Sequence, residues 1–234
     1  MAKAPKILIF TATYEGKDYC LDRFLEHASN INYPNVRHIF ITNDRNDKYW
    51  RKLLSKGLDA YWVKRGNSSR EAIARAQNFA RRIAIEEGYD YILSLESDIM
   101  VPPNIAQLLL SCNVDVVSGL YFIGNREQGL RVPCLTLPEI HEDKGYYGTR
   151  LLKPEEWEEY LHKGIKRVQA AGMGCCLIYK SVFRQIPFVY EMGLKGHSDI
   201  YFFNDCFRLA IPVFVQTDIV LDHQNSQWSD VKDR

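Results

Sequence analysis

The feature that most constrains the fold is a long helical pattern that lies between apolar, strand-like runs. Residues 68–88, SSREAIARAQNFARRIAIEEG, begin with Ser68 and Glu71 at the spacing of a capping box and end at Gly88, where a helix commonly stops. Between them, apolar residues recur at helical spacing. Because parallel strands need a long crossover, usually a helix, this arrangement favours a parallel sheet.

Other apolar runs extend the alternation of strands and helices through the chain. A length of 234 residues suits one domain, 1–234, so we predict an α/β fold whose central sheet is mostly parallel and covered by helices on both faces. The predicted strands are residues 6–13, 36–44, 60–66, an acid-ended strand that begins at residue 91 and is stopped by the prolines at 102 and 103, and residues 114–122, 168–179 and 213–223.

The second half of the chain has a less regular pattern. Residues 124–150 contain glycine, proline and scattered charges without a sustained period, which predicts a long loop. A short acidic helix is expected over 154–163, and an amphipathic helix over 198–210 with Asp199 at its start.

Charge is distributed unevenly, although the formal net charge is only +1. Residues 45–82 hold eleven lysines and arginines against three acids, whereas residues 91–120 hold acids and no base. This asymmetry suits a bound anion bridged to a cation better than a uniformly basic nucleic-acid surface. The six cysteines have no C-x-x-C spacing, and no apolar run approaches the length of a membrane span. We therefore expect a cytoplasmic protein without a membrane span.

An acid pair ends the apolar run in residues 91–103, YILSLESDIMVPP. In an extended chain Glu96 and Asp98 leave the same face. Two such acids repel each other and are costly to desolvate, so a positive group is expected opposite them. Thr13 and Asp44 end two other predicted strands. Since ligands bind beyond the carboxyl ends of parallel strands, these residues together indicate one site.

The order and spacing of these segments resemble the GT-A fold, which is Rossmann-like, of nucleotide-sugar-dependent glycosyltransferases, most closely the family-2 type, over residues 6–224. The sequence ESD stands where that family has its D-x-D motif. The resemblance implies that Asp98 ligates a divalent cation, Mn²⁺ or Mg²⁺, and that Glu96 contacts the ribose or sugar of the donor. Such a cation would neutralise the charge on a leaving nucleoside diphosphate.

Two further segments resemble donor-binding motifs of the family. TATYEG is similar to P-T-Y-N at the end of the first strand, which implies that Thr11, Ala12, Thr13 and Tyr14 line a nucleobase pocket. TNDRND is similar to a shortened V-D-D-G-S-x-D, which implies that Asp44 faces the base or ribose.

A third donor-binding segment lies on the predicted long helix. IARAQNFA resembles A-R-N-x-G, which implies that Arg75 and Asn78 lie beside the donor. They are one helical turn apart and so share a face, and the forked guanidinium of Arg75 suits a diphosphate.

The C-terminal part carries two more resemblances. GHSDIYFF is similar to G-E-D-x-x-F, which implies that Asp199 is the general base of an inverting enzyme, although Ser198 replaces the usual acidic neighbour. In VLDHQ, His223 stands where many GT-A enzymes place a histidine that completes the metal site. Imidazole with carboxylates suits Mn²⁺ or Mg²⁺.

The function implied is that of a metal-dependent hexosyltransferase. A sugar would pass from a nucleoside diphosphate donor, with UDP favoured, to an acceptor hydroxyl. Residues 1–120 would bind the nucleotide sugar, and residues 121–234 the acceptor, either a saccharide or a hydroxymethylated base in DNA. Two alternatives are a nucleotidyltransferase on a related fold, which usually has a glycine-rich basic loop that TATYEGKDY lacks, and a non-catalytic binding module on a degenerate GT-A fold.

Overall fold

The computed structural model describes residues 4–125, 130–141, 146–191 and 196–224. The strands are β1 (Ile7–Thr13), β2 (Val36–Thr42), β3 (Ala60–Trp62), β4 (Tyr91–Leu95), β5 (Ile99–Met100), β6 (Val116–Asn125), β7 (Leu130–Pro133), β8 (Leu135–His141), β9 (Tyr146–Leu151), β10 (Ile165–Val168), β11 (Ala170–Ala171), β12 (Cys175–Tyr179) and β13 (Val213–His223). The α-helices are α1 (Asp18–Ala28), α2 (Lys48–Ser55), α3 (Ser69–Glu86), α4 (Ile105–Leu110), α5 (Trp157–Tyr160), α6 (Lys180–Gln185) and α7 (Ser198–Arg208), and the 3₁₀ turns are η1 (Glu15–Lys17) and η2 (Pro154–Glu156).

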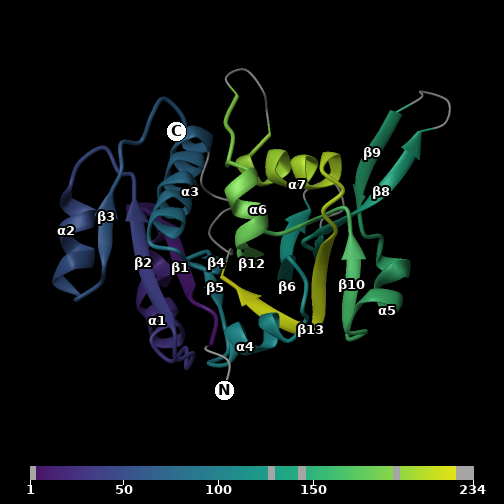
Figure 1. The fold of residues 1–234 in the computed structure, drawn as a ribbon, viewed down its shortest axis with the longest axis horizontal. Coiled ribbons are helices and arrows are strands. Elements are labelled where there is room, and N and C mark those ends of the chain that lie inside the picture. Colours follow the sequence, from purple (N-terminus) through teal and green to yellow (C-terminus); the bar gives the residue numbers. More distant parts are fainter. Residues whose placement is uncertain (1–3, 126–129, 142–145, 192–195, 225–234) are drawn as a thin grey trace.

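The larger sheet has the strand order β10-β13-β6-β12-β4-β1-β2-β3, and β5 and β7 pair with β13 and β6 (Figure 1). The neighbours β4, β1, β2 and β3 run parallel, whereas β12 is antiparallel to β4 and β6, and β10 is antiparallel to β13. The sheet is therefore mixed: β4, β1, β2 and β3 pair parallel as predicted, and so do β6 and β13, but the antiparallel strands β12 and β10 depart from the predicted mostly parallel sheet. Apolar runs such as β12 indicate a buried strand but carry no sign of its direction.

A smaller sheet, β11-β8-β9, replaces the loop predicted over residues 124–150. Strands β8 and β9 pair antiparallel from Thr136 opposite Leu151 to His141 opposite Tyr146. Strands β8 and β9 are stabilised by pairing with each other, and β8 also pairs with β11. Neither therefore needs the continuous apolar run by which a buried strand is recognised from sequence. The strand predicted over 168–179 is likewise two strands, β11 and β12, which residues 172–174 separate.

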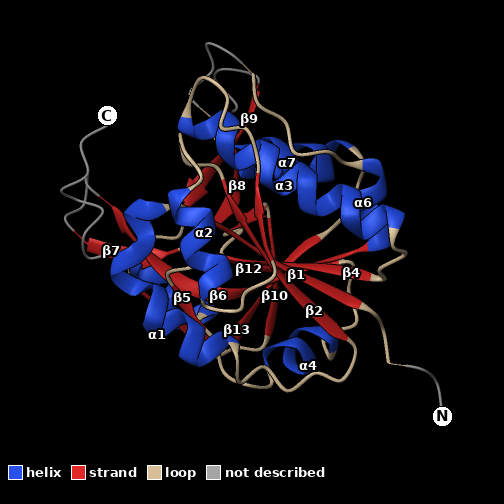
Figure 2. Cartoon of the chain, turned by 90° about the vertical axis from the view of Figure 1, so that its left-hand side faces the viewer, coloured by secondary structure: helices blue, strands red, loops and turns tan. Residues whose placement is uncertain are grey.

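Side chains of the central strands alternate between two apolar cores. Leu8 and Phe10 point to the core shared with α3, α6 and α7, whereas Ile7 and Ile9 point to the core shared with α1, α2 and α4. Figure 2 shows α3, α6 and α7 together on one side of the strands, with α1 and α4 on the other. Helices therefore cover both faces, as predicted.

The predicted long helix is present as α3. The Ser68 hydroxyl accepts a hydrogen bond from the Glu71 backbone N–H at 3.1 Å, and Gly88 follows the helix with φ of +67°. The Glu71 carboxylate caps the turn by accepting from the Asn67 N–H at 2.7 Å.

Among the described residues, no helix combines the length and apolar character needed to cross a membrane.

Candidate active site

Three of the predicted site residues converge at one edge of the larger sheet. Glu96 follows β4, Asp98 precedes β5, and His223 ends β13. Strand β13 runs parallel to β6, and both β6 and β4 run antiparallel to β12, so β4 and β13 end at the same edge. One oxygen from each acid and one imidazole nitrogen lie within 4.8 Å of one another. A carboxylate oxygen of Glu96 could therefore ligate the same cation as Asp98 and His223.

Lys17, which no sequence pattern had indicated, lies inside this site. Its Nζ forms an ion pair with Oδ2 of Asp98, and the two side chains are 9% and 0% exposed. Lys17 comes from η1, directly after β1, so the topology brings it to the end of β4. The only signal for it was general: two acids on one face needed a positive partner.

Asp98 has further partners but leaves one oxygen without any. Its Oδ2 lies 3.4 Å from Nε2 of His223, and its backbone oxygen accepts from the Gln224 N–H at 2.8 Å. Its Oδ1 is buried and has no hydrogen-bond partner among the described residues. Because an unpaired buried carboxylate oxygen is costly, Oδ1 marks a position that a ligand could satisfy.

Two glycines and a tyrosine hold the backbone around the acids. The Glu96 N–H donates to the Gly174 carbonyl oxygen at 2.8 Å, and the Gly174 N–H donates to Oη of Tyr121 at 3.0 Å. A Cβ on Gly172 would lie only 2.1 Å from that Oη. Because residues 172 and 174 have no side chains, the Tyr121 ring has room to pack against this segment.

The imidazole of His223 is oriented by contacts on the side away from the acids. Its Nδ1 lies 3.0 Å from the Phe122 carbonyl oxygen, which can only accept, so Nδ1 carries a proton. The edge of the Tyr121 ring packs against the imidazole, with ring centroids 5.1 Å apart. In the neutral ring Nε2 is then free to accept or to ligate, and it points toward the acids.

Burial and mutual charge shift the pKa values of the site. Burial, then the charge of Asp98, raises the pKa of Glu96 to about 7. Burial also opposes the charged form of Asp98, but hydrogen bonds from His223 and Lys17 outweigh it and lower the pKa of this carboxyl. For His223, burial favours the neutral form, yet Asp98 prevails and raises the pKa. The site therefore holds two acids of different basicity.

Asp199 lies at the start of α7, as predicted, and is half-buried. Its Oδ1 accepts from the Ile200 N–H at 2.8 Å, and burial raises the pKa of the carboxyl. The charge of Asp199 also contributes, as the smallest of the named causes, to the raised pKa of Glu96. A carboxylate there can both cap the helix and accept a proton.

The predicted nucleobase residues lie at the end of β1, and two of them face the protein interior. The Thr11 hydroxyl lies 2.8 Å from Nε2 of His38, and the Thr13 hydroxyl lies 3.5 Å from Oη of Tyr49. Both threonines are buried. Ala12 is half-buried and packs against the core.

Tyr14 and Asp44 flank the loop that leads into η1. Tyr14 is half-buried, and its ring covers Gly16, where a Cβ would come within 2.4 Å of it. The Asp44 carboxylate accepts from the Thr42 hydroxyl at 2.6 Å and from the Glu15 N–H at 3.3 Å. Asp44 therefore connects the ends of β1 and β2.

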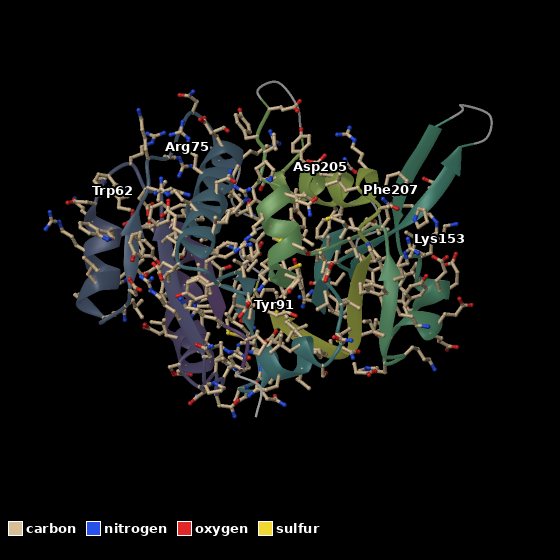
Figure 3. The ribbon with its side chains drawn as sticks, in the orientation of Figure 1. Trp62, Arg75, Tyr91, Lys153, Asp205 and Phe207 are labelled. Carbon is tan, nitrogen blue, oxygen red and sulfur yellow. The ribbon has the colours of Figure 1, made fainter. Side chains whose placement is uncertain are left out.

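Arg75 and Asn78 have partners within the protein. Arg75 forms a 2.6 Å ion pair with Glu71, and its side chain is 41% exposed; Figure 3 shows it among the elements of the N-terminal half. The Asn78 amide donates to the Phe188 carbonyl at 2.5 Å and accepts from its N–H at 3.1 Å. Asn78 thus anchors the segment after α6 to α3.

The donor set fits a hard divalent cation. Two carboxylates and one imidazole are ligands that Mn²⁺ accepts readily, and the unpartnered Oδ1 of Asp98 offers a ligand atom. Lys17 holds the other oxygen of the same carboxylate. The geometry therefore permits a divalent cation at Asp98, next to the positive charge that Lys17 already supplies.

Comparison with known proteins adds little to this description. No protein-family model matches the sequence, and no curated protein matches it. Among solved structures, the chain is similar to "Crystal Structure of A197 from STIV", with a TM-score of 0.48 and 15% identity over 94% of this chain and 95% of that chain. Any assignment of function therefore depends on the site itself.

Proposed function

We propose that this protein is a metal-dependent glycosyltransferase. It would transfer a sugar from a nucleoside diphosphate donor, with UDP favoured, to an acceptor hydroxyl with inversion. The observation that carries the proposal is the convergence of Glu96, Asp98 and His223 at the edge where parallel strands end, together with a buried Asp98 oxygen that has no hydrogen-bond partner in the described part of the chain.

In this proposal Asp98 and His223 hold Mn²⁺ or Mg²⁺. The cation would neutralise charge on the leaving diphosphate. Glu96 contacts the ribose or sugar of the donor. Asp199 accepts the proton of the acceptor hydroxyl, and burial supports this role because it raises the pKa of the carboxyl and makes it a stronger base.

The remaining donor contacts stay part of the proposal. Thr11, Ala12, Thr13, Tyr14 and Asp44 would surround the nucleobase and ribose from the ends of β1 and β2. The two buried threonines would shape this pocket chiefly through their backbone, because their hydroxyls already have internal partners.

On the diphosphate side, Arg75 and Asn78 belong to the same proposal. Arg75 would exchange Glu71 for phosphate oxygens, and its partial exposure allows this movement. The acceptor is a glycan or a hydroxymethylated base in DNA.

The direct experiment is a screen of nucleotide sugars that measures released nucleotide with Mn²⁺ and with EDTA. We expect release with Mn²⁺, its loss in EDTA, and its loss in Asp98→Asn, which keeps the shape of the side chain while removing its charge. No release from any donor in the presence of Mn²⁺ would refute the proposal. Adding modified DNA or oligosaccharides to the active reaction identifies the acceptor class.

The ion pair between Lys17 and Asp98 favours a second candidate, a non-catalytic nucleotide-binding module. In that case the ammonium already neutralises the acid that a cation would need. Calorimetry would then show nucleotide binding that is equal in EDTA and in Mn²⁺, without turnover of any donor.

A further inference from the structure

Lys17 is an unusual neighbour for a metal site. Its nearly buried ammonium already supplies the positive charge that a metal ion would bring to Asp98. The Lys17 side chain is 9% exposed, and its partner Asp98 is fully buried. Lysine is seldom buried without a charged partner. Here the ion pair offsets part of the cost of burying Asp98 close to a second acid.

Hydrogen bonds hold the backbone of Lys17 independently of its side chain. Its N–H donates to the Tyr14 carbonyl at 2.8 Å, and its own carbonyl accepts from the Cys20 thiol at 3.2 Å. The four-carbon stem between this backbone and the ammonium is flexible. Motion of the head group therefore needs no change in η1 or α1.

A metal and this ammonium would meet at the same carboxylate. Oδ2 of Asp98 contacts Nζ of Lys17 and lies 3.4 Å from Nε2 of His223, the nitrogen available for ligation. A divalent cation bound to Asp98 would lie within about 5 Å of the ammonium if Lys17 stayed in place. At that distance, and away from water, two positive charges repel strongly.

We propose that Lys17 is a resident cation that competes with the divalent metal for Asp98, and that metal binding moves its ammonium off Oδ2. The inference rests on the metal site of the proposed function. It also predicts coupling, because the ammonium that has left Oδ2 can pair with the negative charge of a nucleotide's diphosphate. Metal and nucleoside diphosphate should therefore each strengthen the binding of the other, by the same factor.

Calorimetric titration of Mn²⁺ into EDTA-free protein tests the competition. Lys17→Met keeps the length of the stem and removes the charge, so we expect it to bind Mn²⁺ about tenfold more tightly than the wild type. UDP should tighten Mn²⁺ binding in the wild type, and less so in the variant. The matched control is Lys56→Met, which removes a surface ion pair with Asp22 and should leave Mn²⁺ affinity unchanged. Equal or weaker Mn²⁺ binding by folded Lys17→Met would overturn the proposal.

A measurement on the wild type keeps the proposal testable if Lys17→Met does not fold. The rate of amine modification at each lysine can be followed by mass spectrometry, with and without saturating Mn²⁺ and UDP. We expect Lys17 to react slowly in EDTA and at a different rate when Mn²⁺ displaces it, while the rate at Lys56 stays constant. No Mn²⁺-dependent change at Lys17 would overturn the proposal.

These outcomes separate the two proposals. Metal-dependent donor turnover together with unchanged Mn²⁺ affinity in Lys17→Met would refute the competition and leave the glycosyltransferase assignment standing. A tighter Mn²⁺ site in Lys17→Met without turnover of any donor would refute that assignment and leave the competition standing.

Discussion

The close approach between Gly172 and Tyr121 makes Gly172→Ala the sharpest test of how the site is supported. The added Cβ would lie 2.1 Å from Oη and 2.3 Å from Cζ of Tyr121, so the ring must move. Overpacking of this kind costs about 1–3 kcal/mol. Movement of the ring would also break the hydrogen bond from the Gly174 N–H, worth about 1 kcal/mol. We expect the free energy of unfolding to fall by about 2–4 kcal/mol.

Urea unfolding followed by circular dichroism measures this change, and thermal melts should show a midpoint lower by about 4–16 °C for a chain of this size. Because Tyr121 packs against His223, Mn²⁺ affinity should fall as well. Gly124→Ala is the matched control, since its Cβ would meet no described residue within 4 Å. Wild-type stability of Gly172→Ala would show that Tyr121 does not hold the site as described.

Three further predictions concern single side chains. Asp199→Asn should keep nucleotide affinity but slow sugar transfer about a hundredfold or more, as measured by product formation; equal loss of binding and transfer would make Asp199 structural. Burial raises the pKa of Glu96 from 4.5 to about 7, so the folded protein binds more protons than the unfolded chain between these values and loses stability as the pH rises through them. In EDTA, urea melts should therefore find Glu96→Gln more stable than the wild type above pH 7, by up to about 3 kcal/mol, and equally stable below pH 4.5; a pH-independent difference would contradict this. Asn78→Ala should lower the free energy of unfolding by about 1–2 kcal/mol, because two hydrogen bonds to Phe188 are lost, and a neutral effect in urea melts would contradict that role.

Local patterns predicted the N-terminal half of the fold well. The cap at Ser68 and the glycine at 88 defined α3 to within two residues of its observed ends. Apolar runs located β1, β2 and β4 because these strands are buried on both faces and need no partner to reveal them.

The second half was harder to predict because its structure depends on distant pairing. Strands β8 and β9 are stabilised by each other, and the antiparallel direction of β12 is set by the strands on either side of it. Neither property leaves a local trace in the sequence.

In the candidate site, too, some residues could be predicted from local patterns and others could not. Glu96, Asp98 and His223 stand at strand ends, so topology alone brings them together. Lys17 belongs to a short 3₁₀ turn without a recognisable pattern, and its partner lies 81 positions away. The partners of Arg75 and Asn78 were equally hidden, because helical spacing gives the face of a residue and not its contacts.

The dispersal of the site along the polypeptide has a consequence for synthesis. Lys17 emerges from the ribosome first, the two acids follow once four strands exist, and the imidazole arrives with the last strand. If the site binds a metal ion as proposed, a nascent chain would neutralise Asp98 internally long before it could retain that ion, and ion capture would wait until the sheet is complete.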